Sequence, residues 1–297
     1  MKKYIIILLF NSLIYSQVNT STGYTFLNLG NSGREIALSD FGAVGGEQVS
    51  NVYYNPATLI SIKNPQVYFT HNIWISDVSA QTLGANFYLF DFPVSINVNN
   101  TAIKDIEIRT KPNGLYSKFD ARYFYFGISS ALSFSKKISF GLTAKYIYEN
   151  ILSDESSGYA ADLGIIYSNA LDNLNLGLSI RNLGSVSELR HEKSDIPIDF
   201  RFGASYKLQI SQIESSVILL SGIQKNLNAD DIHLHFAVEY SYDDLIFIRI
   251  GYLTGYESRG ISFGAGFALG SAELDYSFVP FDFGLGNSNA ITLLYNF

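Results

Sequence analysis

The sequence predicts an all-β fold, a transmembrane antiparallel β-barrel of about 14 strands with roughly ten residues each. Three observations predict it. From residue 66 onward apolar and polar residues alternate with a period of two, the connections between these segments alternate between short and long, and the chain ends in such a segment on Phe297. An even number of strands of this length is typical of barrels that cross an outer membrane.

The period-two alternation is clearest in five segments, which are residues 138–148, 174–181, 199–207, 232–241 and 273–278. In residues 232–241, Leu234 and Phe236 share one face while His233 and His235 share the other, because successive strand residues point to opposite faces. A membrane barrel turns its apolar face to lipid and its smaller, more polar face to the lumen. Residues 66–74 and 215–224 alternate less clearly, so the pattern assigns no faces to them.

The connections form two classes. The short ones are residues 135–137, 243–244 and 270–271, and the long ones between them are residues 103–120, 149–158, 182–197 and 280–287. Outer-membrane barrels have short periplasmic turns and long outer loops, whereas a soluble β-sandwich has no reason to place long loops at alternate junctions. With both termini on the short-turn side, an even strand count closes consistently.

The composition narrows the possible functions. Tyr and Phe together make up 43 of the 297 residues, while charged residues make up only 16%. This excess suits strands and the aromatic girdles of a membrane barrel. The chain has no cysteine, which excludes a disulfide scaffold, a thiolate metal site and a lipid-anchored cysteine. The net charge of −7 gives no reason to expect a nucleic-acid partner, which would require clustered basic residues.

The N-terminal part divides into two segments. Residues 1–16 carry two lysines followed by a short apolar run, which predicts a signal peptide cleaved after Ser16. Residues 17–65 are rich in glycine and predict a compact plug with one or two short helices. Within it, Pro56 disfavours helical geometry at Asn55, so residues 54–57 are expected to form a turn or the start of a helix. We expect the barrel to comprise residues 66–297.

Charged residues also occupy positions on the predicted inner face. A basic residue in contact with lipid near the midplane would destabilise the barrel by about 2–4 kcal/mol. We therefore place these charges in the lumen. Both signs occur, and a hydrogen-bonded network that braces the lumen is favoured over a selectivity ring. These lumen charges are Lys145, Asp162, Arg181, Asp199, Arg201, Glu239, Arg249, Glu273 and Asp275. The inward glycines, at positions 141, 164, 177, 203, 251, 264 and 266, leave room for the plug to lie against the wall.

The sequence contains residues for two kinds of chemical site, a metal site and a hydrolase site. His233 and His235 share a face at a spacing that can chelate a metal, but without cysteines the other ligands would have to be carboxylates such as Glu239. We favour two polar residues that line the lumen. A barrel hydrolase would need a serine and a histidine within hydrogen-bond reach, and no serine lies in a Gly-x-Ser-x-Gly turn. We therefore expect no enzyme activity, no metal and no cofactor.

Several short motifs resemble the PorV/PorQ family, exported barrels related in fold to the FadL fatty-acid channels. The plug motifs are residues 26–29, Gly33-Arg34-Glu35 and residues 52–57, which include Asn55-Pro56-Ala57; residues 157–164 and 180–184 match two further landmarks. The resemblance implies a FadL-like barrel whose N-terminal segment enters the lumen. It also implies residence in the outer membrane of a Gram-negative bacterium and a role in type IX secretion.

Two functional hypotheses follow. The first is a non-enzymatic docking or shuttle component of protein secretion, in contact with membrane lipid and with secretion or attachment subunits. The loops 104–120 and 182–197 mix both signs of charge and would offer the partner surface. The alternative is a FadL-like channel for hydrophobic small molecules. It needs an apolar lumen or a lateral opening, and the predicted inner face, being small, polar or charged, counts against it.

The final segment, residues 288–297, places Ile291, Leu293, Tyr295 and Phe297 on one face. We expect it to close the barrel against residues 66–74. Its terminal aromatics Tyr295 and Phe297 are expected to serve as the signal that barrel-assembly machinery reads, a property known for outer-membrane proteins as a class.

Deleting Phe297, or the substitution Phe297→Asp, is expected to impair assembly in the outer membrane without affecting export across the inner membrane. The measurement is the amount of folded barrel in outer-membrane fractions compared with the amount of exported chain. Normal insertion of the Phe297→Asp variant would contradict the assigned role.

Overall fold

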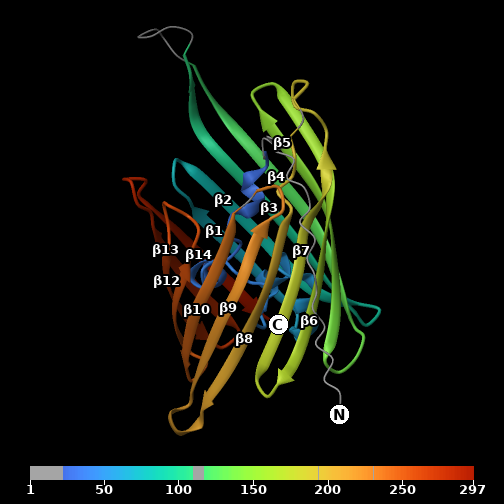
Figure 1. Cartoon of the computed structure of the whole chain (residues 1–297), viewed down its shortest axis with the longest axis vertical. Coiled ribbons are helices and arrows are strands. Elements are labelled where there is room, and N and C mark those ends of the chain that lie inside the picture. The colour runs from blue at the N-terminus through green and yellow to red at the C-terminus, as the bar shows by residue number, and fades with distance from the viewer. Residues whose placement is uncertain (1–22, 110–116, 193, 230) are drawn as a thin grey trace, which may run out of the picture.

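The computed structural model describes residues 23–109, 117–192, 194–229 and 231–297, and these form a closed antiparallel barrel of 14 strands (Figure 1). Each strand pairs with its neighbours in the chain, and β14 pairs with β1 to close the ring. The predicted fold class is confirmed. The expected signal peptide, residues 1–16, and residues 17–22 of the expected plug lie outside the described residues.

The strands differ strongly in length. The first seven are β1 (Gln66–Ile73), β2 (Val78–Leu89), β3 (Phe92–Ile108), β4 (Ser117–Ser133), β5 (Ile138–Ile151), β6 (Asp154–Leu171) and β7 (Leu174–Val186). The others are β8 (Asp199–Ile210), β9 (Ser215–Asn226), β10 (Ile232–Tyr242), β11 (Ile246–Leu253), β12 (Ile261–Leu269), β13 (Ala272–Pro280) and β14 (Asn287–Asn296). A short 3-10 turn, η4 (Ser211–Ile213), joins β8 to β9.

The prediction of one long loop is wrong. Residues 149–158 are not a loop, because β5 runs to Ile151 and β6 begins at Asp154, leaving a two-residue turn. The ladder continues through Glu149 opposite Ser156 and Asn150 opposite Glu155. Polar side chains indicated a loop in the sequence, but a strand that projects beyond the bilayer has water on its faces and tolerates them. For the same reason the β3–β4 connection is shorter than the expected residues 103–120.

The faces of the strands separate apolar from polar residues. On β14, Ile291 and Leu293 are more than half exposed on the outside, whereas Thr292 and Leu294 are buried inside. The register sets Phe69 opposite Leu293 and Thr70 opposite Thr292, which confirms the expected pairing of the last segment with the first. The face of β1 that the sequence left unassigned is thereby settled, with Thr70 facing the lumen and Phe69 facing outward.

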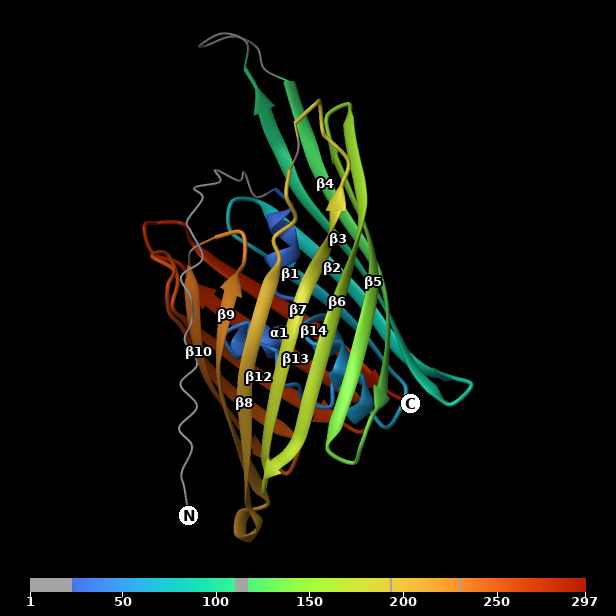
Figure 2. The same ribbon diagram turned by 45° about the vertical axis from the view of Figure 1, so that its right-hand side comes forward.

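Residues 23–65 lie inside the barrel and carry four short helices (Figure 2). These are η1 (Thr25–Asn28), α1 (Gly33–Ala37), η2 (Val49–Tyr53) and η3 (Pro56–Ser61). Asn55 caps η3, since its side chain accepts a hydrogen bond from the Ala57 N–H, and Pro56 occupies the first helical position. Within the described residues, no helix has the length and apolar character needed to cross a membrane.

Glycines on the inner wall receive this plug. A Cβ atom at Gly141 would lie 2.2 Å from the Ala57 nitrogen, and one at Gly164 would lie 2.0 Å from Asn55 Oδ1. The backbone of β5 and β6 therefore approaches the start of η3 more closely than any side chain would allow. Gly177, Gly203, Gly251 and Gly264 meet other plug residues in the same way, whereas a Cβ at Gly266 would meet the wall residues Asp275 and Arg249.

We expect Gly141→Ala to destabilise the folded protein by about 1–3 kcal/mol, because the added methyl group overlaps plug backbone that cannot rotate away. Gly127→Ala is the matched control: it lies on the neighbouring strand β4, opposite Lys145, and its Cβ would have no neighbour closer than 3.5 Å. Denaturant unfolding of the detergent-solubilised barrels measures the difference. Equal stability of the two variants would contradict the proposed fit.

Candidate functional site

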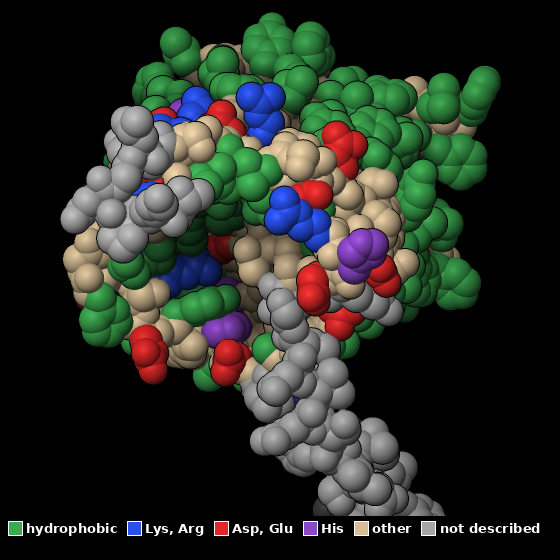
Figure 3. All heavy atoms as spheres, turned by 90° about the horizontal axis from the view of Figure 1, so that it is seen from above, with side chains coloured by type: hydrophobic (Ala, Val, Ile, Leu, Met, Phe, Trp, Pro, Cys, Tyr) green, Lys and Arg blue, Asp and Glu red, His purple; other side chains and the backbone are tan. Residues whose placement is uncertain are grey.

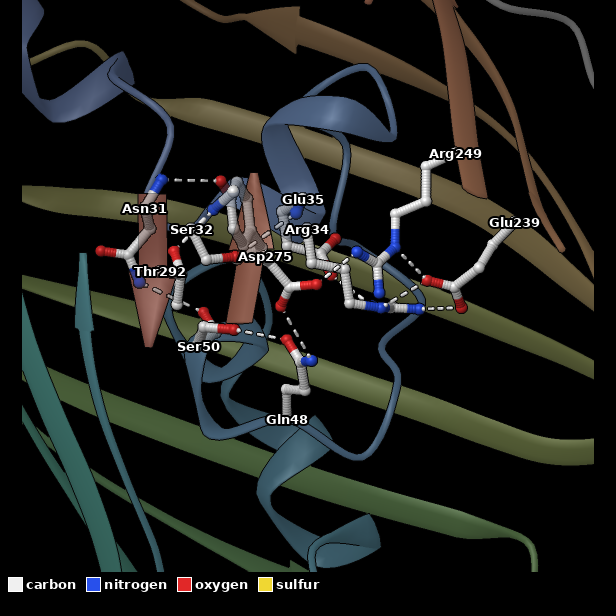
Figure 4. A network of polar contacts seen from close by, with 12 residues as sticks. Asn31, Ser32, Arg34, Glu35, Gln48, Ser50, Glu239, Arg249, Asp275 and Thr292 are labelled. Carbon is white, nitrogen blue, oxygen red and sulfur yellow. Dashed lines mark hydrogen bonds and ion pairs between the residues drawn. The ribbon is translucent and has the colours of Figure 1, made fainter. Parts of the chain in front are cut away.

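The inner face of the barrel holds the plug through a buried cluster of charges around Arg34 on α1 (Figure 4). The Arg34 guanidinium donates to both carboxylate oxygens of Glu239 on β10, from Nε at 2.9 Å and from Nη2 at 2.8 Å. This bidentate arrangement is the strongest common geometry for an arginine–carboxylate pair. Arg34 also contacts Glu35 on its own helix. Burial raises the pKa of the Glu35 carboxyl above its ordinary value, while Arg34 opposes the shift.

Arg249 on β11 completes this cluster from the wall. Its Nε donates to Glu239 Oε2 at 2.5 Å, and its other nitrogens contact Asp275 and Glu273 on β13. Gln48 of the plug donates to Glu273 at 2.9 Å and to Asp275 at 3.4 Å. Glu239 thus bridges one plug arginine and one wall arginine, and the plug cannot shift without separating buried charges.

Local geometry fixes where Arg34 points. Ser32 caps α1 by accepting a hydrogen bond from the Glu35 N–H, and the Gly33 N–H donates to Thr292 Oγ1 on β14 at 2.8 Å. The helix start is therefore bound to the strand that closes the barrel. A Cβ at Gly33 would lie 3.1 Å from the Asp275 carbonyl oxygen, so a larger residue would push the helix from the wall.

A second cluster holds the plug through side chains of β7 and β8. Arg201 on β8 donates from Nη1 to the carbonyl oxygens of Asp40 and Phe41, both at 2.6 Å, and pairs with Asp199 at 2.7 Å. Arg181 on β7 pairs with the same Asp199 at 3.0 Å, and its Cζ lies 4.1 Å from the centre of the Tyr53 ring. Here the wall supplies the side chains and the plug supplies carbonyl oxygens and an aromatic ring.

The two other lumen charges in this region mark a bulge between β6 and β7. The register passes from Ala161 opposite Leu183 to Leu163 opposite Ile180, and Asp162 Oδ1 accepts the Asn182 N–H at 2.7 Å. Lys145 on β5 pairs with Asp162 at 2.6 Å. The sequence landmarks 157–164 and 180–184 therefore face each other across this bulge.

The structure brings the expected lumen charges together in these two clusters. Arg34 and Glu35 join the first, while Asn55, Pro56 and Ala57 pack on the β5–β6 wall. Tyr295 and Phe297 lie at the outer surface with their ring centres 4.9 Å apart. Sequence reasoning missed Gln48, Asp40 and Thr292, because uncharged or backbone partners leave no pattern in the sequence.

The histidines have structural partners. His235 lies within hydrogen-bond distance of the Ser39 carbonyl oxygen, at 2.8 Å, and of Gln224 Oε1, at 3.0 Å. His233 lies 3.0 Å from the Thr254 carbonyl oxygen and stacks on Tyr256. In the described part of the chain no group of three or more metal-binding side chains forms, and no histidine ring is hydrogen-bonded to a serine hydroxyl.

Comparison with known proteins gives a likeness of fold. Neither protein-family models nor curated proteins show a match. Among solved structures, the CymD monoaromatic hydrocarbon channel matches with a TM-score of 0.63 and 13% identity over 91% of this chain and 98% of its own. The Pseudomonas putida toluene transporter TodX matches with a TM-score of 0.62 and 12% identity, over 94% of this chain and 98% of its own. A Pseudomonas aeruginosa FadL homologue matches with a TM-score of 0.57 and 11% identity, over 90% of this chain and 98% of its own.

These neighbours confirm the FadL-like fold, and the barrel resembles outer-membrane proteins of Gram-negative bacteria. The PorV/PorQ part of the expected resemblance finds no support in them.

Substituting Arg34→Met is expected to destabilise the folded state by about 3–5 kcal/mol, because Glu35 stays buried without its cation. The loosened plug should also raise ion conductance through the barrel in planar bilayers. Arg122→Met provides the control: its side chain is 68% exposed and lies 3.9 Å from Asp120, so we expect a loss of about 1 kcal/mol or less. Wild-type conductance and stability in the Arg34→Met variant would show that the cluster does not hold the plug.

Proposed function

We propose that this protein is an outer-membrane channel for hydrophobic small molecules and that the described conformation is its closed state. The observation that carries the proposal is the match, over more than nine-tenths of the chain, to barrels whose names give them as hydrocarbon channels or a toluene transporter. At 12–13% sequence identity these matches show a similar fold. That this protein also transports hydrophobic molecules is our proposal.

In the described conformation the plug engages the lumen charges, so they do not line an open route. A polar inner face would disfavour a hydrophobic solute if those charges lined the route. Instead, Glu239, Asp275 and Arg201 are all engaged by plug atoms. The charges therefore serve as a latch, and the passage of a solute requires plug residues to leave these contacts.

The absence of native cysteines allows a direct test of plug movement. Ser39 of the plug and Ser262 on β12 are adjacent, with the Ser39 N–H donating to Ser262 Oγ at 3.2 Å. We expect the double variant Ser39→Cys/Ser262→Cys to form one disulfide on oxidation, because only the introduced pair is present. Oxidised cells should lose toluene uptake, and reductant should restore it.

The host for this assay is a deletion strain complemented with each variant, and the single variant Ser39→Cys under the same oxidant is the control. Cross-linking is verified on gels before uptake is compared. Undiminished uptake by a fully cross-linked barrel would rule out plug displacement as the route. No difference in uptake between the deletion strain and the wild type would rule out the channel.

A second candidate is the docking role in type IX secretion that the PorV/PorQ resemblance implies. The observation that favours it is the tall wall around β3, β4 and β6, which have 17 or 18 residues against 8 to 10 in β11–β14 (Figure 1). A membrane strand needs about 9–11 residues, so the tall wall projects beyond the bilayer by roughly 20 Å.

The tall wall carries both signs of charge. Lys118 pairs with Asp105 at 2.9 Å, and Arg109 pairs with Glu107 at 2.6 Å. Exposed pairs such as these add little to stability, so their role would be contact with a partner. The same deletion strain discriminates the two candidates: loss of surface-attached secreted proteins with normal toluene uptake would favour docking over the channel.

A further inference from the structure

The outer end of the barrel is hollowed and carries charged and histidine side chains among apolar ones (Figure 3). A cavity of about 390 Å³ lies there between the β11–β12 and β13–β14 connections. Its lining includes Thr254, Tyr256, Glu257, Arg259 and Asp282. This volume is at the lower end of the range that small-molecule sites occupy.

Arg259 lines this cavity and lies against two aromatic rings. Its Cζ lies 4.6 Å from the centre of the Tyr256 ring and 5.1 Å from that of Trp74, which comes from the β1–β2 connection. Tyr256 in turn stacks on His233 at 4.0 Å, and Trp74 meets Phe281 edge to face at 5.1 Å. Rings from several connections therefore hold one half-buried guanidinium in place.

The hydrogen-bond donors of Arg259 have no partner among the described residues. Among the residues that the structure describes, its guanidinium has no hydrogen bond and no ion pair, unlike the buried arginines of the lumen. Contacts with ring faces leave the N–H groups free to bind an acceptor. A positioned guanidinium with unused donors in a cavity is suited to bind a carboxylate.

Arg259 also connects this cavity to the plug. It lines a second, much smaller pocket together with Ser39 and Asp40 of the plug and Ser262 of the wall. That pocket has room for about one water molecule, with a volume of about 10 Å³. A ligand at Arg259 would therefore rest directly above plug residues that the second lumen cluster holds.

We propose that Arg259, Trp74 and Tyr256 form a binding site for small monoanionic carboxylates with a flat apolar body, such as an aromatic acid. This goes beyond the proposed channel function, because it gives the mouth a ligand class other than hydrocarbons and does not depend on toluene uptake. Apolar lining residues of the cavity, such as Leu253, Ile261 and Pro280, cover the apolar body, and the guanidinium that Trp74 and Tyr256 position pairs with the carboxylate.

Two other ligand classes fit less well. A phosphate dianion would meet the carboxylates of Glu257 and Asp282, which line the same cavity, and would be repelled more strongly than a monoanion. A neutral hydrocarbon would cover the guanidinium without supplying an acceptor, leaving its donors unpaired. A single negative charge on an aromatic body satisfies both constraints.

Trp74 is the only tryptophan of the chain, so its fluorescence reports on the site without labelling. The experiment titrates the purified, detergent-solubilised full-length protein with sodium benzoate, and calorimetry gives the affinity independently. Benzyl alcohol is the neutral ligand control, and inorganic phosphate is the dianion control. We expect benzoate to bind and to change Trp74 emission, whereas both controls bind at least tenfold more weakly.

Two variants test the assignment of Arg259. Arg259→Gln keeps a long polar side chain and should weaken benzoate binding about tenfold or more, because a charge-assisted contact is lost. Arg122→Gln removes an exposed arginine from another part of the mouth and should bind benzoate as the wild type does. Equal benzoate affinity in wild type and Arg259→Gln, or equal binding of benzoate and benzyl alcohol, would overturn the proposal.

The outcomes for this site and for the channel are separable. Arg259-dependent benzoate binding in a protein that supports no toluene uptake would leave the site standing and remove the channel. Toluene uptake without measurable benzoate binding would leave the channel standing and remove the site.

Discussion

The rest of the structure depends on the shared carboxylate of Glu239, which accepts from Arg34 of the plug and from Arg249 of the wall. Charges enclosed by a barrel wall must be paired, because each unpaired one costs several kcal/mol. Once Arg34 is bound to β10, the start of α1 lies against β13 and β14. The glycines of the wall then decide how closely the remaining plug backbone approaches.

The barrel provides a rigid frame for this pairing, since closure of β14 on β1 leaves no free strand edge. The two charge clusters occupy different parts of the ring, the first on β10, β11 and β13 and the second on β5 to β8. The plug is held by these directional contacts and also by apolar clusters that it shares with the wall, such as Val49, Leu59 and Ile62 packed with Tyr68 and Leu294.

The two proposed functions use different parts of the barrel. A channel for hydrophobic molecules uses the mouth above Arg259 and the latch beneath it, and a docking component would use the tall wall of β3, β4 and β6. Both are compatible with the same membrane frame, because the fold sets where the protein resides and the sites set what it binds. Arg259 links the mouth to the plug, because it lines the mouth cavity and also the small pocket that Asp40 of the plug lines.

The sequence by itself determined most of the strands and the faces that most of them turn to lipid and lumen. These features follow from a local period of two, which residues 66–74 and 215–224 display too weakly to assign a face. Only the tertiary structure decided which charges meet, since Arg34 and Glu239 are 205 residues apart, and that residues 149–158 are strand and turn rather than loop. Partners across the lumen depend on strand register and on plug position, and neither is encoded within one stretch of chain.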